Sequence, residues 1–171
     1  MIGPELVRLD RRWRRAFLEM AAEQQAAGET RYDEALSDFD GHLAVLEAHA
    51  RGEGLGAGRV PYEVHLLVDE GEVLGVARLR FGLTEELLDE GGNVGYEIRP
   101  SRRGQGHGRT LLRLALEVMA ERGMWRARVT CDDDNAASAA IIEGARGVLD
   151  EVGISTESGK PVRRYWVKTT P

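Results

Sequence analysis

The stretch from Ile98 to Arg109 constrains this chain more than any other, because it places closely spaced glycines directly before an apolar, helix-like segment. The glycines alternate with polar residues: Gly104, Gly106 and Gly108. Glycine lacks a Cβ, so the loop can turn tightly and a ligand can approach its backbone. The loop amides then lie at a helix N-terminus, where unpaired N–H groups and the positive end of the helix dipole attract phosphate. Three arginines add positive charge there: Arg102, Arg103 and Arg109. The stretch therefore predicts binding of a phosphate-bearing ligand.

Composition limits what the rest of the chain can be. The 171 residues are 42% hydrophobic and 30% charged, which suits one globular domain over residues 1–171. The net charge of −6 argues against a nucleic-acid partner and favours attraction of cationic small molecules. A single cysteine, Cys131, excludes an internal disulfide and a cysteine-rich zinc site, and we expect no metal. No apolar run reaches membrane-spanning length and no signal-peptide core is present, so we expect a cytoplasmic protein without a membrane partner.

Hydrophobic periodicity and turn residues predict alternating groups of strands and helices. Strands are expected at Glu5–Asp10, Tyr62–Asp69, Val73–Leu83, Asn93–Arg99, Trp125–Cys131, Gly147–Ile154 and Pro161–Thr169. Helices are expected at Arg11–Ala27, Tyr32–Ala50, His107–Glu121 and about Ala136–Ala145, with a helical turn at Thr84–Glu90. The glycine-rich segment 51–59 precedes a strand rather than a helix, so we interpret it as a flexible loop inside the domain.

Two nucleotide-binding motifs also use glycine-rich loops, and the spacing favours neither. A triphosphate-binding loop requires a lysine and a hydroxyl residue after its last glycine, whereas Gly108 is followed by Arg109 and Thr110. A dinucleotide-binding loop requires Gly-x-Gly-x-x-Gly tight against a strand, whereas Pro100–Arg103 separates this loop from the preceding strand. Asp132 lies near the place of a ribose-binding acid, but the hairpin-type strands upstream disfavour a repeated βαβ sheet.

A family resemblance fits the loop better. Arg103-Gly-Gln-Gly-His-Gly108 resembles the Gln/Arg-x-x-Gly-x-Gly/Ala signature of the GCN5-related N-acetyltransferases, the GNAT superfamily. The resemblance, to one bacterial branch of acetyltransferases, covers about Val60 to Val167 and includes the element order and Asn135 at a helix start. It implies an α/β (α+β) fold: a mixed, mostly antiparallel central sheet with helices on both faces. The strand before the loop and the strand after its helix would splay apart around acetyl-CoA.

The resemblance also assigns residues to the cosubstrate. The amides of Gln105–Arg109 would hold the pyrophosphate beside Gly104, Arg103 would anchor the loop or a phosphate, and His107 would face the phosphates. Ile98 and Arg99 would pair their backbones with the pantetheine arm like an added strand, and an amide near Ile98 would bond the thioester carbonyl and then the developing oxyanion. Asn135 and Ser138 would contact pantetheine, although Asn135 is equally suited to a simple helix N-cap.

The implied chemistry is direct attack of a neutral amine on the thioester, which requires a general base and an acid. Glu97 is our candidate base, with Glu90 as the alternative, although an outward-facing Glu97 would only be solvated. Many relatives have a tyrosine acid seven residues after the asparagine, where this chain has Ile142; Arg146 also replaces a usual glycine. Tyr165 is therefore the candidate acid and Tyr96 the alternative, each also suited to a purely packing role. Cys131 is disfavoured as an acetylated nucleophile, because no histidine adjoins it in sequence.

Two functions follow from this pattern. The first is an acetyl-CoA-dependent N-acetyltransferase acting on a primary amine of a small molecule or a protein. The second is a non-catalytic acyl-CoA-binding module, which Ile142 in place of the acid keeps open. Edge strands would also permit a homodimer.

Overall fold

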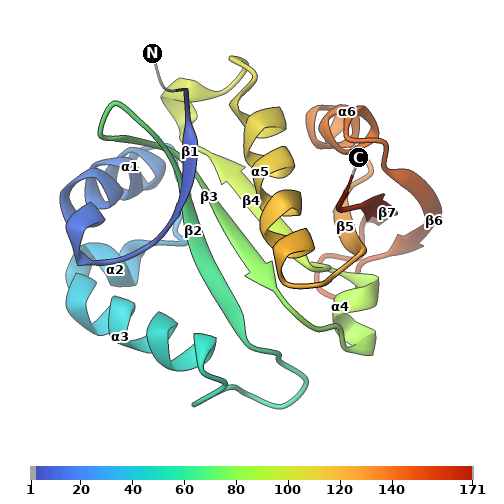
Figure 1. Cartoon of the computed structure of the whole chain (residues 1–171), viewed down its shortest axis with the longest axis horizontal. Coiled ribbons are helices and arrows are strands. Elements are labelled where there is room, and N and C mark those ends of the chain that lie inside the picture. Colours follow the sequence, from blue (N-terminus) through green and yellow to red (C-terminus); the bar gives the residue numbers. More distant parts are fainter. Residues whose placement is uncertain (1–2, 171) are drawn as a thin grey trace.

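The computed structural model describes residues 3–170, and its strands form two sheets (Figure 1). The larger sheet is antiparallel and contains, in spatial order, β1 (Glu5–Arg8), β2 (Tyr62–Asp69), β3 (Glu72–Arg80) and β4 (Val94–Ile98). The smaller sheet has the order β5-β7-β6, formed by β5 (Arg126–Asp132), β6 (Val148–Ile154) and β7 (Pro161–Lys168). The helices are α1 (Arg14–Ala26), α2 (Asp33–Ser37), α3 (Phe39–Ala50), α4 (Glu85–Asp89), α5 (His107–Glu121) and α6 (Ala136–Gly144).

Apolar side chains on both faces of the larger sheet hold it between two layers of helices. On one face, Phe17 of α1 and Leu43 of α3 pack with strand residues such as Leu66 in one buried cluster. On the other face, Leu111 of α5 packs with Leu79 in a second cluster, which continues into the smaller sheet. This arrangement confirms the predicted mixed, mostly antiparallel fold with helices on both faces.

The β2–β3 hairpin turns at Glu70 and Gly71, which have φ angles of 47° and 82°. Positive φ at both central positions is typical of the two-residue turn that suits the twist of a hairpin, and glycine adopts it without strain. The predicted antiparallel hairpin is therefore confirmed.

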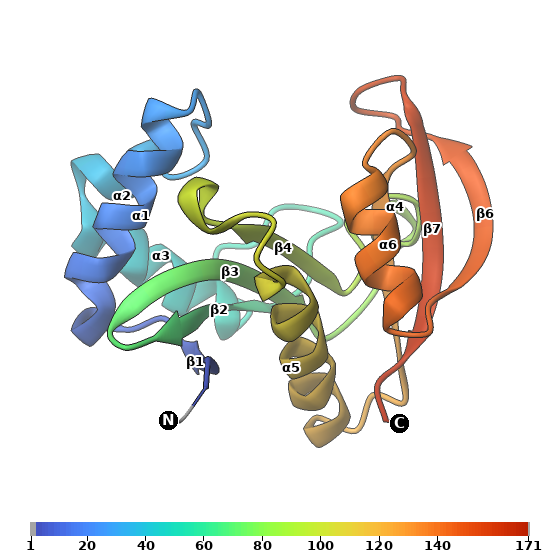
Figure 2. The same cartoon turned by 90° about the horizontal axis from the view of Figure 1, so that it is seen from above.

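The C-terminal part stands beside the larger sheet, with α5 between the two (Figure 2). Helix α6 packs on the smaller sheet through Ile142, which is fully buried in the cluster that also contains Leu111 and Tyr165. Strand β6 forms an edge of this sheet, and its side chains are exposed along almost its whole length.

Strands β4 and β5 approach each other at one end only. There the Asn93 amide donates to the Arg128 carbonyl at 2.7 Å, and the Arg128 amide donates to Asn93 Oδ1 at 2.8 Å. Asn93 also bonds β3, because its Nδ2 donates to the Arg80 carbonyl at 3.0 Å and its own carbonyl accepts from the Arg80 amide at 2.8 Å. Beyond this point the two strands belong to separate sheets, so the fold has the expected splay, and Asn93 marks where it begins.

Two local predictions differ from the structure. The expected continuous helix over Tyr32–Ala50 is interrupted at Asp38, whose φ and ψ are −148° and 88°. The Asp38 side chain accepts from the Gly41 amide, so it caps α3 instead of continuing α2. The expected helix from Arg11 begins with a short 3₁₀ turn, Arg11–Trp13, before α1.

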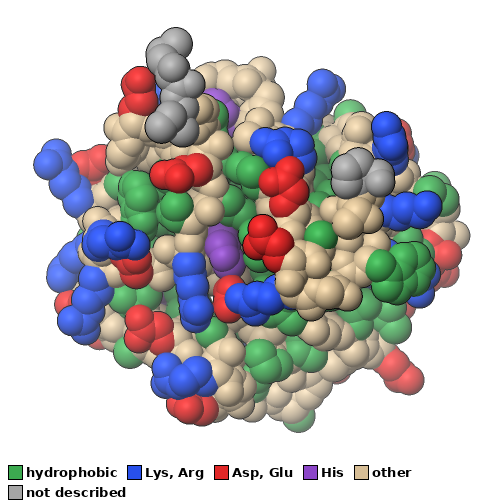
Figure 3. Space-filling model, in the orientation of Figure 1, with side chains coloured by type: hydrophobic (Ala, Val, Ile, Leu, Met, Phe, Trp, Pro, Cys, Tyr) green, Lys and Arg blue, Asp and Glu red, His purple; other side chains and the backbone are tan. Residues whose placement is uncertain are grey.

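On the face that carries β1 and α5, basic and acidic side chains are interspersed, and no large area has a single sign of charge (Figure 3). No helix within residues 3–170 is long and apolar enough to cross a membrane.

Candidate active site

The glycine loop ends at the N-terminus of α5 with a run of free amides. Gly106 occupies the N-cap position with φ +86°, a left-handed conformation that suits glycine, and no side chain caps the helix. Within the described chain, the amides of residues 104–108 donate to no backbone or side-chain acceptor. The Arg109 amide, which the sequence assigned to the phosphate, instead bonds the Gly106 carbonyl at 3.2 Å. The free donors are therefore shifted by one residue toward Gly104, and together they form an anion-binding concavity.

The basic side chains before this loop are used to hold it. Arg99 bonds Glu23 at 2.6 Å and Glu72 at 2.9 Å. Arg103 Nε donates to the Ile98 carbonyl at 3.0 Å, and its Nη2 reaches Glu29 at 2.6 Å.

Two further contacts hold the same loop, one to β3 and one within the loop. Arg102 pairs with Glu72 at 2.6 Å. Gln105 Nε2 donates to the Ser101 carbonyl at 3.1 Å. The contacts of Arg103 with Ile98 and Glu29 anchor the loop, which is the first of the two roles expected for this side chain.

Strand β4 presents alternate backbone groups to the splay. In an antiparallel pair, alternate residues direct both backbone groups toward the neighbouring strand. The Asn93 carbonyl accepts from the Arg80 amide of β3 at 2.8 Å, and the Arg99 amide donates to the Leu74 carbonyl of β3 at 2.9 Å, so residues of this parity face β3. The groups that face away from β3 therefore belong to Tyr96 and Ile98. The expected backbone pairing of Arg99 with pantetheine is corrected, because β3 already uses its amide.

The start of α6 lies across the splay from β4. Asn135 Oδ1 accepts from the Ser138 amide at 3.0 Å, so its helix-capping role is confirmed. The Tyr96 hydroxyl donates to Ser138 Oγ at 3.4 Å and thereby joins β4 to α6. Burial is the main cause that raises the pKa of Tyr96.

Cys131 is half-buried on β5, and burial raises the pKa of its thiol to about 11. At neutral pH the side chain is therefore a protonated thiol rather than a nucleophilic thiolate.

Tyr165 and Glu97 lie in different hydrogen-bond networks. Tyr165 is fully buried in the core under α5, and its hydroxyl donates to Glu143 Oε1 of α6 at 2.9 Å. Its pKa is raised, first by burial and also by its bond to Glu143. Ile142, at the position of the usual acid, is fully buried and supplies no polar group.

Glu97 faces the side of the larger sheet covered by α1 and α2, where its carboxylate is held by several donors. The Tyr32 hydroxyl donates to Glu97 Oε1, and Arg78 Nη2 donates to the same oxygen at 2.8 Å. Arg31 Nε lies 3.4 Å from Glu97 Oε2. Nothing in the sequence pattern pointed to Tyr32 or Arg78, because the α1–α2 connection and β3 meet only in the folded chain.

Glu90, the alternative base, is engaged elsewhere. Its carboxylate accepts from Ser155 Oγ at 2.8 and 2.7 Å. Ser155 also accepts from the amides of residues 157 and 158, so Glu90 fastens the turn between β6 and β7.

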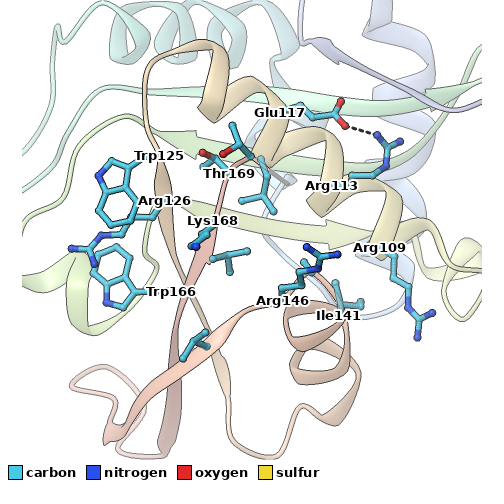
Figure 4. Close-up of a pocket in the computed structure, with 16 residues that line it drawn as sticks. Arg109, Arg113, Glu117, Trp125, Arg126, Ile141, Arg146, Trp166, Lys168 and Thr169 are labelled. Atoms are coloured by element: carbon cyan, nitrogen blue, oxygen red, sulfur yellow. Dashed lines mark hydrogen bonds and ion pairs between the residues drawn. The ribbon is translucent and has the colours of Figure 1, made fainter.

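A cavity of about 780 Å³ opens beside α5, between the C-terminal ends of α6 and β7 and the start of β5 (Figure 4). Arg109 and Arg113 of α5 line it, together with Arg146 after α6. Arg126 lies over the rings of Trp125 and Trp166, 4.6 and 4.0 Å from their centroids. The sequence places Arg109 at the phosphate loop and does not predict this cavity, whose other basic residues come from separate elements. Among the described residues no cluster of three or more metal-binding side chains occurs.

Comparison with known proteins gives a matching family and several similar structures. The model of the acetyltransferase (GNAT) family matches residues 14–147. Among proteins with curated functions, none matches the sequence significantly. An acetyl transferase from Salmonella typhimurium that modifies the N-terminal serine of 50S ribosomal subunit protein L7/L12 has a similar structure, with TM-score 0.69, 20% identity and coverage of 98% and 96% of the two chains.

Two further solved structures are similar over nearly their whole length. The ribosomal-protein-S5-alanine acetyltransferase from Vibrio fischeri has TM-score 0.75 at 11% identity, covering 99% of this chain and 95% of its own. The protein yncA from Salmonella typhimurium, solved with its cofactor acetyl-CoA, has TM-score 0.63 at 17% identity, covering 98% and 95%. At these identities the likeness concerns the fold.

Proposed function

The chain belongs to the acetyltransferase (GNAT) family, and we propose that it is an acetyl-CoA-dependent N-acetyltransferase that acts on a primary amine by direct attack on the thioester. One observation carries this proposal: the run of free amides at residues 104–108, beside the opening between β4 and β5. Unpaired amides at a helix N-terminus are suited to a pyrophosphate, and a splayed strand pair is suited to an extended arm.

The chain offers further groups along the proposed path of the cosubstrate. The pyrophosphate would bond the amides of residues 104–108, and Arg109 and Arg113 would attract the phosphates of the nucleotide end toward the cavity beside α5. The outward-facing backbone groups of Tyr96 and Ile98 would pair with the pantetheine arm. Asn135 and Ser138 would lie on the opposite side of that arm, and the Ile98 amide would donate to the thioester oxygen.

The acceptor would approach from the side of the sheet that carries Glu97. In the transfer, the acceptor nitrogen bonds to the acetyl carbon, the bond from that carbon to sulfur breaks, and a proton moves from nitrogen to a base while the thiolate gains one. We propose Glu97 as the group that receives the amine proton, because it faces α1 and α2 and its carboxylate is held in place by Tyr32 and Arg78. Tyr165 as the acid stays a prediction from the sequence.

The cosubstrate proposal is tested by ligand-induced stabilisation. Acetyl-CoA binds the folded state and should raise Tm, by an amount equivalent to about 2.7 kcal/mol at a concentration of 100 Kd. NADH and ATP at equal concentration should raise it far less. A larger shift with NADH would refute the assignment. Release of free CoA thiol over a panel of amines then separates a transferase from a non-catalytic binding module, the alternative that Ile142 leaves open.

The glycine loop offers a matched pair of variants. Gly106 and Gly123 lie at opposite ends of α5 with φ of +86° and +79°, and a Cβ at either position would meet nothing within 4 Å. Gly106→Ala and Gly123→Ala should therefore cost similar stability, roughly 1–2 kcal/mol for a side chain in the left-handed region. Only Gly106→Ala should weaken acetyl-CoA binding in calorimetry, because only Gly106 adjoins the free amides. Equal loss of affinity in both variants would contradict the proposed phosphate site.

Other predictions on partners and location complete the proposal. A homodimer would use the exposed edge strand β6, which carries apolar side chains at Val148, Val152 and Ile154. Light scattering of the purified protein tests it, and a monomer at all concentrations would exclude it. The cytoplasmic location and the absence of a nucleic-acid partner stay predictions from the sequence.

A further inference from the structure

Three arginines lie on the side of the larger sheet that faces α1 and α2, and a fourth, from the glycine-rich loop, is near enough to repel one of them. They are Arg31 from the α1–α2 connection, Arg59 from the glycine-rich loop, and Arg78 and Arg80 from β3. The side chain of Arg78 is only 16% exposed, while that of Arg31 is 58% exposed, so the group extends from the sheet surface to solvent. The sequence does not reveal this cluster, because its members come from three separate segments.

One carboxylate forms ion pairs with arginines of this cluster. Glu97 pairs with Arg78 at 2.8 Å and with Arg31 at 3.4 Å. Arg80 has no carboxylate within ion-pair distance in the described chain; its Nη1 donates to the backbone carbonyls of Gly91 and Gly92 at 3.2 and 3.3 Å.

The other nearby acidic residues are fewer than the arginines and, in the part of the chain that the structure describes, make no ion pair with them. Glu90 keeps its negative charge, but its carboxylate is directed to the Ser155 hydroxyl. The Glu86 carboxylate approaches Gly58, next to Arg59, but makes no ion pair with it among the described residues. Positive charge therefore exceeds negative charge on this side of β4.

The excess of positive charge affects the protonation of Arg80. Its pKa is lowered, first by burial and then by the like charges of Arg78, Arg31 and Arg59. Positive groups taken out of water are costly unless an anion compensates them, and the cost is relieved when a ligand supplies that anion. The cluster adjoins Glu97, the group proposed to receive the acceptor's proton.

We propose that the acceptor is an amine that also bears an anionic group, a carboxylate or a phosphate, which these arginines bind while the amine meets Glu97. The inference rests on the proposed acetyl transfer and adds the chemical class of the acceptor. It reverses the expectation from the net charge of −6, because the charge around the site differs in sign from that of the whole chain. Polyamines, which carry only positive charge, are the acceptors that this side of the sheet disfavours.

The experiment compares matched amines at saturating acetyl-CoA, with release of CoA thiol as the readout. The pairs are phenylalanine against phenylalaninamide, phosphoethanolamine against ethanolamine, and the C-terminally amidated peptide Ser-Asp-Glu against the amidated peptide Ser-Asn-Gln; spermidine is the cationic probe. We expect kcat/KM to be roughly tenfold or more higher for the anionic member of at least one pair than for its neutral partner and spermidine, the size of one charge-assisted contact. The pair that responds identifies the source of the anion.

Variants at the exposed arginines test the cause of that preference. Arg59→Gln should reduce kcat/KM for the anionic acceptor several-fold and leave that for its neutral partner little changed. Arg31→Gln also removes a partner of Glu97, so it should lower kcat/KM for both acceptors, and by several-fold more for the anionic one. Arg15→Gln is the control, since Arg15 is 93% exposed on α1 and pairs only with Glu19 among the described residues. The preference should also shrink as salt is raised.

The remaining outcomes are decisive in different ways. Equal rates within every pair, or fastest turnover of spermidine, overturns the anionic acceptor and leaves acetyl transfer standing. A preference that survives both Arg59→Gln and Arg31→Gln also overturns the assignment to this cluster. No thiol release with any amine, although acetyl-CoA raises Tm, overturns acetyl transfer itself and with it this inference.

Discussion

Replacing Asn93 by alanine should loosen the junction from which β4 and β5 diverge. The side chain bonds both sheets at once: Nδ2 donates to the Arg80 carbonyl at 3.0 Å, and Oδ1 accepts from the Arg128 amide at 2.8 Å. Asn93 is fully buried and Arg128 is 3% exposed, so no water replaces the amide after truncation. Two buried backbone groups are then left without partners.

The magnitude follows from those two groups. Each buried donor or acceptor left unsatisfied costs about 1–3 kcal/mol, so Asn93→Ala should lower the free energy of unfolding by about 2–6 kcal/mol. For a chain of this size that corresponds to a fall in Tm of about 4–24 °C. Because the same bonds set where the splay begins, the variant should also bind acetyl-CoA more weakly in calorimetry, even at temperatures at which it is fully folded.

Urea unfolding measures the stability change, with Gln25→Ala as the matched control. Gln25 presents the same amide group, but it lies on the surface, where its Nε2 bonds Asp33 at 2.9 Å. Its removal should change stability by no more than about 0.5 kcal/mol. If Asn93→Ala costs no more than this control, or if acetyl-CoA affinity is unaffected in the folded variant, then Asn93 does not fasten the two sheets as described.

Three other changes have defined outcomes. Burial lowers the pKa of His65 to about 4, against the opposing influence of Glu63, so the folded protein keeps this ring neutral. In the unfolded chain His65 binds a proton near pH 6.5, whereas in the folded chain it does not. The contribution of His65 to the free energy of unfolding is therefore complete above that pH and falls by about 3 kcal/mol as pH drops toward 4, which urea titrations measure. His65→Leu should remove that part of the decline, and an identical decline in this variant would refute the role of His65. Gly108→Val should separate α5 from α6, because even a Cβ there would lie 2.7 Å from Ile141 Cδ1, and the loss should appear in Tm before acetyl-CoA is added. Glu97→Gln should lower kcat by roughly 10²–10⁴-fold and leave acetyl-CoA affinity nearly unchanged, and a kcat near that of the parent would exclude Glu97 as the base. Tyr165→Phe tests the proposed acid in the same way.

Local sequence patterns predicted the helices and strands well, because interactions between residues close in sequence largely determine where these elements form. The glycines before His107 and the apolar spacing of α5 identify the helix start directly, and the predicted bounds His107–Glu121 agree with the structure. The same reasoning merged α2 and α3, since both share one apolar periodicity. The break depends on whether the Asp38 side chain bonds the Gly41 amide, a local competition that periodicity does not report.

Side-chain roles were predicted less well than elements. Arg103 was expected to anchor the loop or a phosphate, and the choice depended on Glu29, which lies far from it in sequence but 2.6 Å away in space. Arg99 was assigned to pantetheine, yet its amide is bonded by Leu74 and its side chain by Glu23 and Glu72. Whether a strand-end backbone group is free depends on its neighbour in the sheet, which one strand's sequence does not specify.

The order of strands and helices, the glycine loop at a helix start and the family resemblance follow from the sequence, because each depends on consecutive residues. The free amides of the loop, the point where β4 and β5 diverge and the charges around Glu97 became known from the folded chain. Those outcomes depend on distant segments: Asn93 joins two sheets, and Arg31 and Arg78 meet one carboxylate although α2, α3 and β2 lie between them in the chain. Hydrogen bonds and ion pairs act over a few ångströms of space whatever the separation in sequence, so the set of charges around Glu97 forms only when the chain has folded.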